Sequence, residues 1–394
     1  MNALIDNPSR ILPDDVDDAT LVGRVLADNG PCVVVLRGGT VIDITATFPT
    51  MSDLLESADP VAAARNATGV RSWPIHEILA NSLDEADALP RLLAPVDLSV
   101  LKAAGVTFAT SLLERLIEER AGGNPEQANT LRSELEKIIG TDLSAIRPGS
   151  DAATQLKADL QASGQWSQYL EVGLGPDPEV FTKAPILSAV GCGAEIGVAQ
   201  VSSWNNPEPE VAIAVTSTGR IVGAMLGNDV NLRDVEGRSA LLLPKAKDNN
   251  ASASLGPFIR LLDESFTLDD VRGADVRLEV IGEDDGFRMD DVSYMREISR
   301  DVVALAEYTV GDAHQYPDGI VLYTGTLFSP THDRGGVGMG FTHHLGDIVR
   351  ISSPKLGTLV NRVNHSEKAG RWTFGVRGLI NNLAARGLIG KVGA

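Results

Sequence analysis

Residues 204–229 read WNNPEPEVAIAVTSTGRIVGAMLGND, with two apolar runs on either side of a turn. The runs VAIAV (211–215) and IVGAML (221–226) are short and contain β-branched residues, which is typical of buried strands. The intervening TSTGR is typical of a tight connection between two strands. This stretch therefore predicts a β-hairpin.

Three acidic residues lie at the open end of this predicted hairpin. Because side chains alternate along a strand, Glu208 and Glu210 point to the same face, and the return strand brings Asp229 back beside them. Neighbouring carboxylates repel one another unless a cation lies between them. Oxygen ligands without a nearby Cys or His favour Mg²⁺, Mn²⁺ or Ca²⁺ over Zn²⁺. A bare Glu-x-Glu pair is more often a solvent-facing strand start, so the pattern alone leaves both interpretations open.

The chain after Val180 is rich in strands of the same kind. Further short segments, separated by Gly, Asp and Asn, are VRLEVIG (276–282), GIVLYTGT (319–326) and DIVRISS (347–353). They do not alternate with regular helices, which argues against a doubly wound or TIM-barrel architecture and favours a mostly antiparallel or mixed β-domain. We predict an α+β, β-rich fold.

The first 95 residues are predicted to form a small β-rich domain that ends in a connector. Its strand-like segments are LVGRVLA (21–27), CVVVLR (32–37) and TVIDIT (40–45), which are separated by Asp-Asn-Gly and Gly-Gly turns. Residues 96–394 are predicted to form a second domain. The helices expected at its start are 109–121, 125–140 and 150–163.

The composition excludes several classes of protein. The 394 residues carry a net charge of −19, and the pI is near 4.7. The resulting negative electrostatic field repels nucleic acid and anionic membranes. No apolar run approaches the ~18 residues of a membrane span, and the N-terminus lacks the pattern of a secretory signal. Two cysteines, Cys32 and Cys192, fit a reducing compartment. We expect a cytoplasmic protein that binds neither nucleic acid nor membrane.

An ordered series of motifs extends from the hairpin over most of the chain. Its members are Phe181-x-Lys183-x-Pro185, Gly191-x-Gly193, Glu208-x-Glu210, Gly223, Asn228-Asp229-x-x-x-Arg233, Lys247, Gly256-Pro257, Gly325-Thr326 and Gly346-Asp347. The series resembles the catalytic domain of the fumarylacetoacetate hydrolase superfamily. The resemblance implies a fumarylacetoacetase C-terminal-like fold, a mixed β-roll or sandwich.

The resemblance also implies a set of site residues. In that superfamily two glutamates and an aspartate hold Mg²⁺ or a similar ion, and they correspond to Glu208, Glu210 and Asp229. A lysine beside the ion corresponds to Lys247. A Gly-Thr pair that helps to bind the substrate corresponds to Gly325 and Thr326.

The implied chemistry is that of a 2-oxo acid. Such a substrate chelates a metal through its carboxylate and keto oxygens, and the ion stabilises the enolate that forms when C3 loses a proton. Lys247 is placed by the resemblance to take that proton, provided that metal and burial lower its pKa. Lys245 is the rival base if this segment is extended. Arg233 is a candidate partner of the substrate carboxylate or of the Glu208-x-Glu210 pair, with a structural ion pair as the alternative.

One segment departs from the hydrolase pattern. Family hydrolases usually carry Asn-Tyr-x-x-His-x-x-Glu near the start of the domain, and its His and Glu activate water. The corresponding stretch GVTFATSLLE (105–114) keeps Glu114 but has Ser111 in place of the histidine. Serine at pH 7 cannot replace an imidazole base, whereas a carboxylic acid can still protonate a departing hydroxyl. We expect a site that eliminates water, with Ser111 at the substrate and Glu114 as the acid, or else Glu118 or Glu119.

The departure and its surroundings resemble the sugar-acid dehydratase branch of the superfamily. Matching segments are AGVTFATSLLERLIEERA (104–121), FTKAP (181–185) and KAKDNNASASLGPF (245–258). Members of this branch convert a 2-keto-3-deoxy-pentonate to 2-oxoglutarate semialdehyde in pentose degradation. The resemblance implies a Mg²⁺-dependent hydro-lyase that acts on a small 2-oxo sugar acid and assembles as a homodimer or homotetramer.

Two alternatives remain open at this point. An acylpyruvate-type hydrolase or a 2-oxo acid decarboxylase of the superfamily would use the same metal site. A non-catalytic β-rich binding protein would keep only the fold. The missing histidine supports that last alternative, whereas the intact carboxylates and Lys247 count against it.

Overall fold

The structure, a computed structural model, describes residues 8–84, 88–122, 124, 127–128, 146–162, 164, 166–326, 332–336 and 340–389. Two of the predicted helices are confirmed as α5 (Ala109–Arg120) and α7 (Asp151–Ala162). The third, 125–140, lies almost entirely outside the described residues. Among the helices that are described, none is long and apolar enough to cross a membrane.

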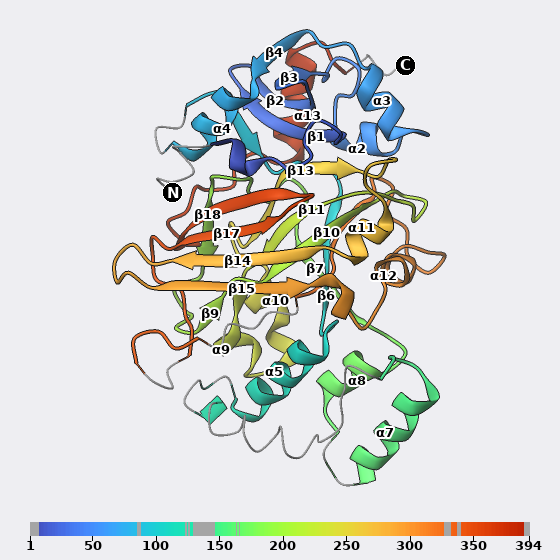
Figure 1. Ribbon diagram of the computed structural model, residues 1–394, viewed down its shortest axis with the longest axis vertical. Helices are drawn as coiled ribbons and strands as arrows, with labels where there is room; N and C mark the ends of the chain where they lie inside the picture. Colours follow the sequence, from blue (N-terminus) through green and yellow to red (C-terminus); the bar gives the residue numbers. More distant parts are fainter. Residues whose placement is uncertain are drawn as a thin grey trace.

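The larger of the two main sheets runs through the whole molecule (Figure 1). Its described strands, in spatial order, are β4 (Arg71–Pro74), β3 (Thr40–Asp43), β2 (Gly30–Arg37), β1 (Leu21–Ala27), β13 (Ala253–Leu261), β11 (Ile221–Asp229), β10 (Pro209–Val215), β16 (Ile320–Tyr323), β6 (Val100–Gly105) and β7 (Glu179–Ala184). Strand β5 (Arg91–Leu93) also pairs with β1. Neighbours along this path are antiparallel except β16 and β6, which are parallel.

The second main sheet packs against the central part of the first. Its strands, in spatial order, are β15 (Arg288–Tyr294), β14 (Asp275–Ile281), β17 (Ile348–Ser353), β18 (Gly357–His365) and β8 (Glu195–Val198). A short ladder joins β9 (Asn205–Asn206) to β12 (Asn231–Leu232). Val211 and Ile213 of β10 share one apolar core with Leu278 of β14 and Ile351 of β17. The predicted β-rich, mixed sandwich-like fold is confirmed.

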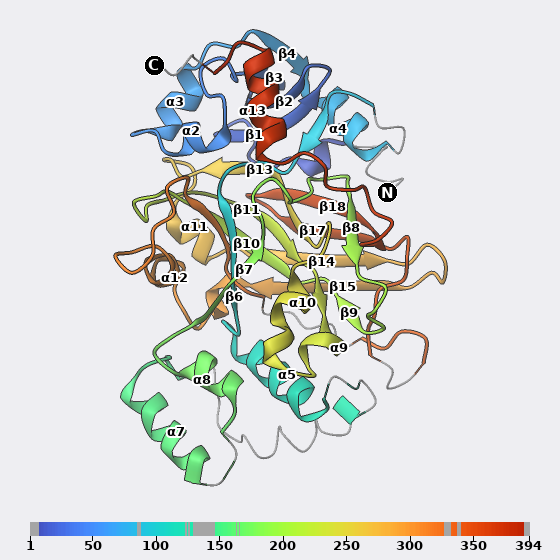
Figure 2. The same cartoon turned by 180° about the vertical axis from the view of Figure 1, so that it is seen from behind.

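Helices lie at the two ends of the molecule and along its side (Figures 1 and 2). The remaining helical segments are η1 (Pro8–Ile11), α2 (Met51–Leu55), α3 (Pro60–Asn66), α4 (Ile75–Leu83), α8 (Gln168–Leu174), α9 (Arg233–Glu236), η3 (Ala240–Leu242), α10 (Leu243–Lys247), α11 (Leu268–Arg272), η4 (Met295–Glu297), α12 (Val302–Thr309) and α13 (Val376–Ala385). Helices α5, α7 and α8 gather at the end opposite the N-terminal strands.

The N-terminal strands continue the central sheet. Leu21 and Val22 of β1 pair antiparallel with Arg260 and Ile259 of β13. The C-terminal helix α13 returns to the same end of the molecule, where Asn382 donates a hydrogen bond to the Asn29 carbonyl at 2.8 Å. The boundary near residue 95 stays a prediction, and the continuous sheet joins the segments on either side of it.

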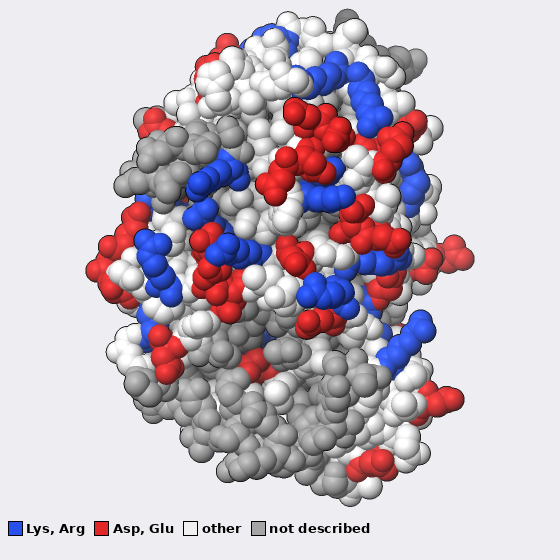
Figure 3. Space-filling view, viewed as in Figure 1, with Lys and Arg blue, Asp and Glu red and all other residues white. Residues whose placement is uncertain are grey.

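The outer face of the smaller sheet carries charges of both signs. Arg277 pairs with Asp290 across β14 and β15, and Arg296 pairs with Asp275 at 2.7 Å. Figure 3 shows acidic and basic side chains interspersed over this face. Charges of both signs therefore alternate over the described part of this face.

The predicted hairpin is confirmed as β10 and β11 at the centre of the larger sheet. Its register pairs Pro209 with Asn228 and Glu210 with Gly227. Every residue of β10 is buried, which explains why its sequence is almost continuously apolar. Gly227 is necessary for this packing, because a Cβ atom there would lie 2.4 Å from the ring of Tyr323.

We expect Gly227→Ala to lower the free energy of unfolding by about 1–3 kcal/mol, the usual effect of overpacking a buried position. The Tyr323 ring has little room to move, because it is buried and its hydroxyl donates to the Ser254 carbonyl at 2.9 Å. Urea unfolding measures the change. Gly370→Ala is the matched control, since no atom lies within 4 Å of a Cβ built there. Equal stability of the two variants would contradict the prediction.

Candidate active site

The three acidic residues at the end of the central hairpin meet in one place. Glu208 precedes β10, Glu210 lies in β10, and Asp229 ends β11. Their side chains are buried, and one oxygen from each lies within 4.8 Å of the others. The hairpin register that pairs Pro209 with Asn228 brings them together. The structure thus assembles the carboxylate cluster, and its oxygen donors fit a hard divalent cation.

Burial makes this cluster unfavourable unless positive groups accompany it. Burial, reinforced by the negative charges of Asp229 and Glu208, raises the pKa of Glu210 well above its usual range. The main-chain N–H of Gly325 donates a hydrogen bond to Glu210 Oε2 at 2.7 Å and partly offsets this effect. The remaining compensation comes from lysine and arginine side chains around the cluster.

Lys247 is one of these compensating groups. Its ammonium lies 2.5 Å from Glu208 Oε2 and 3.1 Å from Asp229 Oδ2. Burial opposes its charge, but attraction by Asp229, Glu208 and Glu236 outweighs burial and raises the pKa of Lys247. Lys245 does not share this position, because the segment forms helix α10 and leaves Lys245 exposed. The condition for Lys245 as a rival base, an extended segment, is therefore not met.

Lys183 is a second lysine at the cluster. The sequence marks it only as part of the Phe181-x-Lys183-x-Pro185 motif, where a lysine among apolar residues is the one available signal. It lies on β7, fully buried, with its ammonium 2.7 Å from Asp229 Oδ1. Burial alone would raise the pKa of Asp229, but the positive charges of Lys183 and Lys247 outweigh it and lower that pKa. Two ammonium groups therefore hold Asp229 as a carboxylate.

Arg115 on α5 connects the cluster to a second group of acids. On sequence grounds it fits an ordinary charged helix surface, but the structure buries most of its side chain. Its guanidinium lies 2.6 Å from Glu208 Oε1, 2.6 Å from Glu118 Oε2 and 2.8 Å from Glu236 Oε2. Burial opposes the charge of Arg115, yet these three carboxylates raise its pKa. Arg115 is thus a fixed positive charge that orients Glu208.

Arg233 belongs to the same ion-pair network. It lies 2.7 Å from Glu118 Oε1 and 3.3 Å from Glu114 Oε2, and its guanidinium stacks 4.3 Å from the centre of the Trp204 ring. These contacts favour the structural ion pair that the sequence left open as the alternative role for Arg233. Glu114, the expected acid, therefore has an arginine as its counter-charge.

A pocket opens over the carboxylate cluster. It is lined by Ala104, Gly105, Val106, Ser111, Arg115, Glu179, Phe181, Glu208, Glu210, Asp229, Glu236, Lys247, Gly325 and Thr326. A smaller neighbouring pocket is lined by Ser111, Glu114, Arg115, Glu118, Asn206, Glu208, Arg233 and Thr326. Both therefore include Ser111 and Thr326, whereas Glu114 lines only the second. Glu119 lines neither and accepts a hydrogen bond from Gln168 at 3.0 Å.

Ser111 has a structural role as well as its place in the pocket. Its hydroxyl donates to the Phe108 carbonyl at 2.9 Å and accepts from the Phe108 main-chain N–H at 3.3 Å. These bonds close the first turn of α5. The hydroxyl is thereby held at the pocket wall, and it provides no basic nitrogen there.

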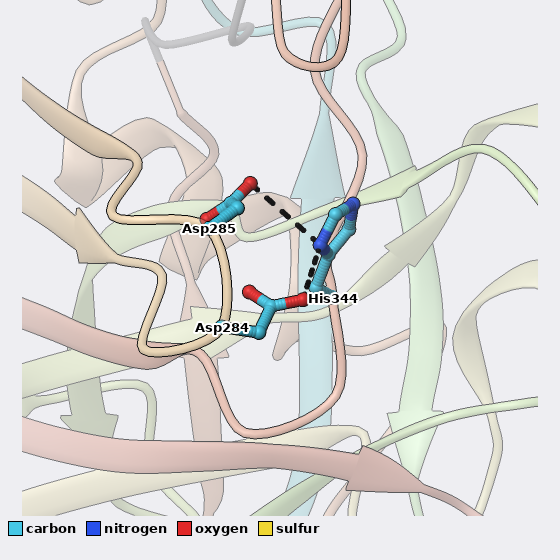
Figure 4. A group of neighbouring side chains, drawn as sticks. All are labelled: Asp284, Asp285 and His344. Carbon is cyan, nitrogen blue, oxygen red and sulfur yellow. Dashed lines mark hydrogen bonds and ion pairs between the residues drawn. The ribbon is translucent and has the colours of Figure 1, made fainter.

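Asp284, Asp285 and His344 form a second group of possible metal ligands (Figure 4). His344 Nδ1 lies 2.9 Å from Asp284 and 3.7 Å from Asp285. All three side chains are partly exposed, and Arg334 donates to Asp285 at 2.8 Å. The guanidinium of Arg334 already supplies this group with a positive charge. The ion pairs connect the turn after β14 to the loop before β17. The Glu208 cluster is therefore the stronger candidate for a metal centre.

Comparison with known proteins identifies the family of the chain. Residues 176–364 match the family of the fumarylacetoacetate (FAA) hydrolase C-terminal domain. The chain is 34% identical over 329 residues to a Haloferax volcanii protein named "Probable 2-keto-3-deoxyxylonate dehydratase", a match that covers 83% of this chain and 93% of that protein. This chain belongs to the fumarylacetoacetate hydrolase superfamily.

Two further proteins resemble the chain. The "2-dehydro-3-deoxy-D-arabinonate dehydratase" of Saccharolobus solfataricus is 32% identical over 191 residues, which span 48% of this chain and 60% of that protein. The solved structure of "2-keto-3-deoxy-D-arabinonate dehydratase complexed with magnesium and 2,5-dioxopentanoate" has a TM-score of 0.60 at 22% identity, and covers 88% of this chain and 99% of that one. The fold implied by the motif series is thus confirmed.

We expect Glu208→Gln and Asp229→Asn each to weaken Mg²⁺ binding by roughly tenfold or more, about 1.4 kcal/mol, because each replaces an anionic ligand with a neutral amide. Isothermal titration of the purified protein with Mg²⁺ measures the affinity. Asp284→Asn is the matched control, since Asp284 belongs to the exposed group away from the pocket. Unchanged affinity in the first two variants would place the ion elsewhere.

Proposed function

We propose that this chain is a Mg²⁺-dependent hydro-lyase that converts a 2-keto-3-deoxy-pentonate to 2-oxoglutarate semialdehyde, which is 2,5-dioxopentanoate. The observation that carries the proposal is the buried cluster of Glu208, Glu210 and Asp229 with Lys247 in contact with two of its members. The names of the two sequence relatives, both dehydratases of 2-keto-3-deoxy sugar acids, support the reaction class.

Glu208, Glu210 and Asp229 would hold the ion. When bound, it supplies Lewis-acid polarisation of the 2-keto group and stabilises the enolate formed at C3. The fit of these residues rests on their chemistry, because three buried carboxylates need a concentrated positive charge and offer only oxygen ligands. The N–H of Gly325, which fixes Glu210, and the adjacent Thr326 would position the substrate beside them.

Lys247 is the proposed base for the C3 proton. Its amine borders any 2-oxo acid bound at the cluster, since it already touches Glu208 and Asp229. Together with Glu236 these carboxylates hold its proton, and Glu208 and Asp229 are also proposed metal ligands. Burial favours the neutral amine once these carboxylates are engaged elsewhere.

The position of Ser111 supports elimination over hydrolysis. Its hydroxyl lines both pockets and is committed to the main chain of Phe108, so this position supplies no base to activate water. An enolate at C3 can then expel a C4 hydroxyl, provided that an acid protonates the leaving oxygen. Arg233 supports this region through Glu114 and Glu118.

A direct assay tests the reaction class. The purified protein with Mg²⁺ is offered 2-keto-3-deoxy-pentonates of both C4 configurations and, separately, an acylpyruvate. We expect 2,5-dioxopentanoate from the former, and loss of activity on EDTA treatment. Hydrolysis or decarboxylation without dehydration would reassign the chain to another activity of the superfamily, and no turnover of any 2-oxo acid would favour a binding protein. Light scattering on the same sample tests the expected homodimer or homotetramer.

We expect Lys247→Ala to abolish exchange of the C3 protons of the substrate with solvent deuterium, because it removes the proposed base, while Mg²⁺ binding persists. Proton NMR in deuterium oxide follows the exchange. Lys245→Ala is the matched control, a lysine in the same helix with an exposed side chain. Retained exchange in Lys247→Ala would show that another group takes the proton.

A further inference from the structure

Asn206 is a polar residue beside the carboxylate cluster that neither the motif series nor the proposed mechanism uses. It ends the short strand β9, two positions before Glu208. Its side chain is buried and lines the smaller pocket. The two pockets share four lining residues, which are Ser111, Arg115, Glu208 and Thr326. Asn206 therefore borders on the outer carbons of any substrate whose 2-oxo acid end lies at the cluster.

The sequence places Asn206 on the same side of the chain as the two glutamates of the cluster. Asn206, Glu208 and Glu210 alternate with Pro207 and Pro209. A residue before proline is restricted to extended backbone, in which side chains two positions apart point the same way. Such residues are separated by about 6.6 Å along the chain. The outer carbons of a five-carbon acid held at Glu208 can bridge a distance of this size.

The amide oxygen of Asn206 has no hydrogen-bond partner. Its amide nitrogen donates to the Pro207 carbonyl at 2.8 Å, and that carbonyl can only accept, so Oδ1 is the atom that faces away from it. Asn231 lies opposite Asn206 in the ladder of β9 and β12, but the two buried amides form no hydrogen bond with each other. A buried carbonyl oxygen without a partner is unfavourable, so it is suited to accept a hydrogen bond from a ligand.

The other polar groups of the smaller pocket are already engaged. Its guanidinium and carboxylate groups form the ion pairs described above, and the Ser111 hydroxyl is bonded to the main chain of Phe108. The structure describes all eight residues that line this pocket, and among them Asn206 Oδ1 is the one buried side-chain oxygen or nitrogen without a hydrogen-bond partner. The pocket thus offers an entering hydroxyl group one buried acceptor that is not yet in use.

We propose that Asn206 is a specificity-determining residue whose Oδ1 accepts a hydrogen bond from the C5 hydroxyl of a 2-keto-3-deoxy-pentonate, an inference that rests on the proposed function. The C4 hydroxyl fits this role less well, because an amide oxygen cannot supply the proton that the departing C4 oxygen needs. The C5 hydroxyl stays on the substrate throughout the elimination. A 2-oxo acid with a methyl group at this position leaves Oδ1 without a donor, so the site favours sugar acids over acylpyruvates.

The experiment compares two substrates that differ in the C5 hydroxyl alone. They are a 2-keto-3-deoxy-pentonate and its 5-deoxy analogue, 4-hydroxy-2-oxopentanoate of the same C4 configuration. The value of kcat/KM for dehydration of each is measured in the unmodified protein and in Asn206→Leu, which replaces the amide with an apolar group of similar size. We expect the unmodified protein to prefer the pentonate by about tenfold or more, the usual scale for a hydrogen bond to a buried group.

The change in this preference separates recognition of the hydroxyl from damage to the fold. In Asn206→Leu we expect kcat/KM for the pentonate to fall by about tenfold or more, while that for the analogue changes little because the analogue never makes the hydrogen bond. The ratio of the two values therefore approaches one another's level in the variant. Exchange of the C3 protons with solvent deuterium should persist with both substrates, since the reacting end of the molecule is the same.

Asn205→Leu is the matched control. Asn205 is the neighbouring residue of β9, and it is also buried with an amide oxygen that has no hydrogen-bond partner, but it lines neither pocket. We expect this variant to keep the preference of the unmodified protein. Asn206→Ala removes the same acceptor with a smaller side chain, and it should lose the preference even if leucine at this position prevents folding.

Each contrary outcome has a separate meaning. If the unmodified protein turns over both substrates equally well, Asn206 does not recognise the C5 hydroxyl and the proposal is wrong, whether or not the variants fold. If Asn206→Leu loses the same factor on both substrates, or if Asn205→Leu loses the preference as well, Asn206 acts through the fold and the proposal is also wrong. If the unmodified protein dehydrates neither compound, the proposed function fails instead.

Discussion

The burial of three carboxylates at one point is the constraint on which the rest of the structure depends. Removing a charge from water costs several kcal/mol, and an interior ion is tolerated only when it is paired and hydrogen-bonded. Here the partners of Asp229 and Glu208 are Lys183, Lys247 and Arg115, which come from β7, α10 and α5. The cluster therefore connects elements that are distant in sequence. A divalent cation bound there would add its charge to those of the lysine and arginine side chains already in place.

The larger sheet holds the carboxylates in position. Glu210 and Asp229 are fixed by the β10–β11 hairpin, whose strands are buried on both faces, and β16 alongside leads to Gly325, whose N–H bonds Glu210. Helix α5 then adds a layer of ion pairs in which Arg115 and Arg233 share Glu118. The N-terminal strands lie at the other end of the molecule, away from this chemistry (Figure 1).

The acids around the pocket differ mainly in their counter-charges. Acids with arginine partners are suited to holding position, because an ion pair fixes both charge and orientation. Ser111 is held at the pocket wall in a different way, since its hydroxyl closes the first turn of α5. The amide oxygen of Asn206 lines the same wall without a hydrogen-bond partner, which suits it to accept a hydrogen bond from a ligand.

The sequence by itself determined the hairpin, the β-rich fold and the meeting of Glu208, Glu210 and Asp229, because strand alternation and a short turn are local properties that a run of residues fixes unaided. The motif series indicated Lys247 but not what it touches. Only the tertiary structure showed that Lys245 is exposed, that Arg115 is buried among three acids, and that the amide oxygen of Asn206 has no partner. These outcomes depend on contacts between strands and helices that are far apart in the chain. At such contacts, burial and the sum of the neighbouring charges decide whether a side chain is exposed or paired, and residue type alone does not.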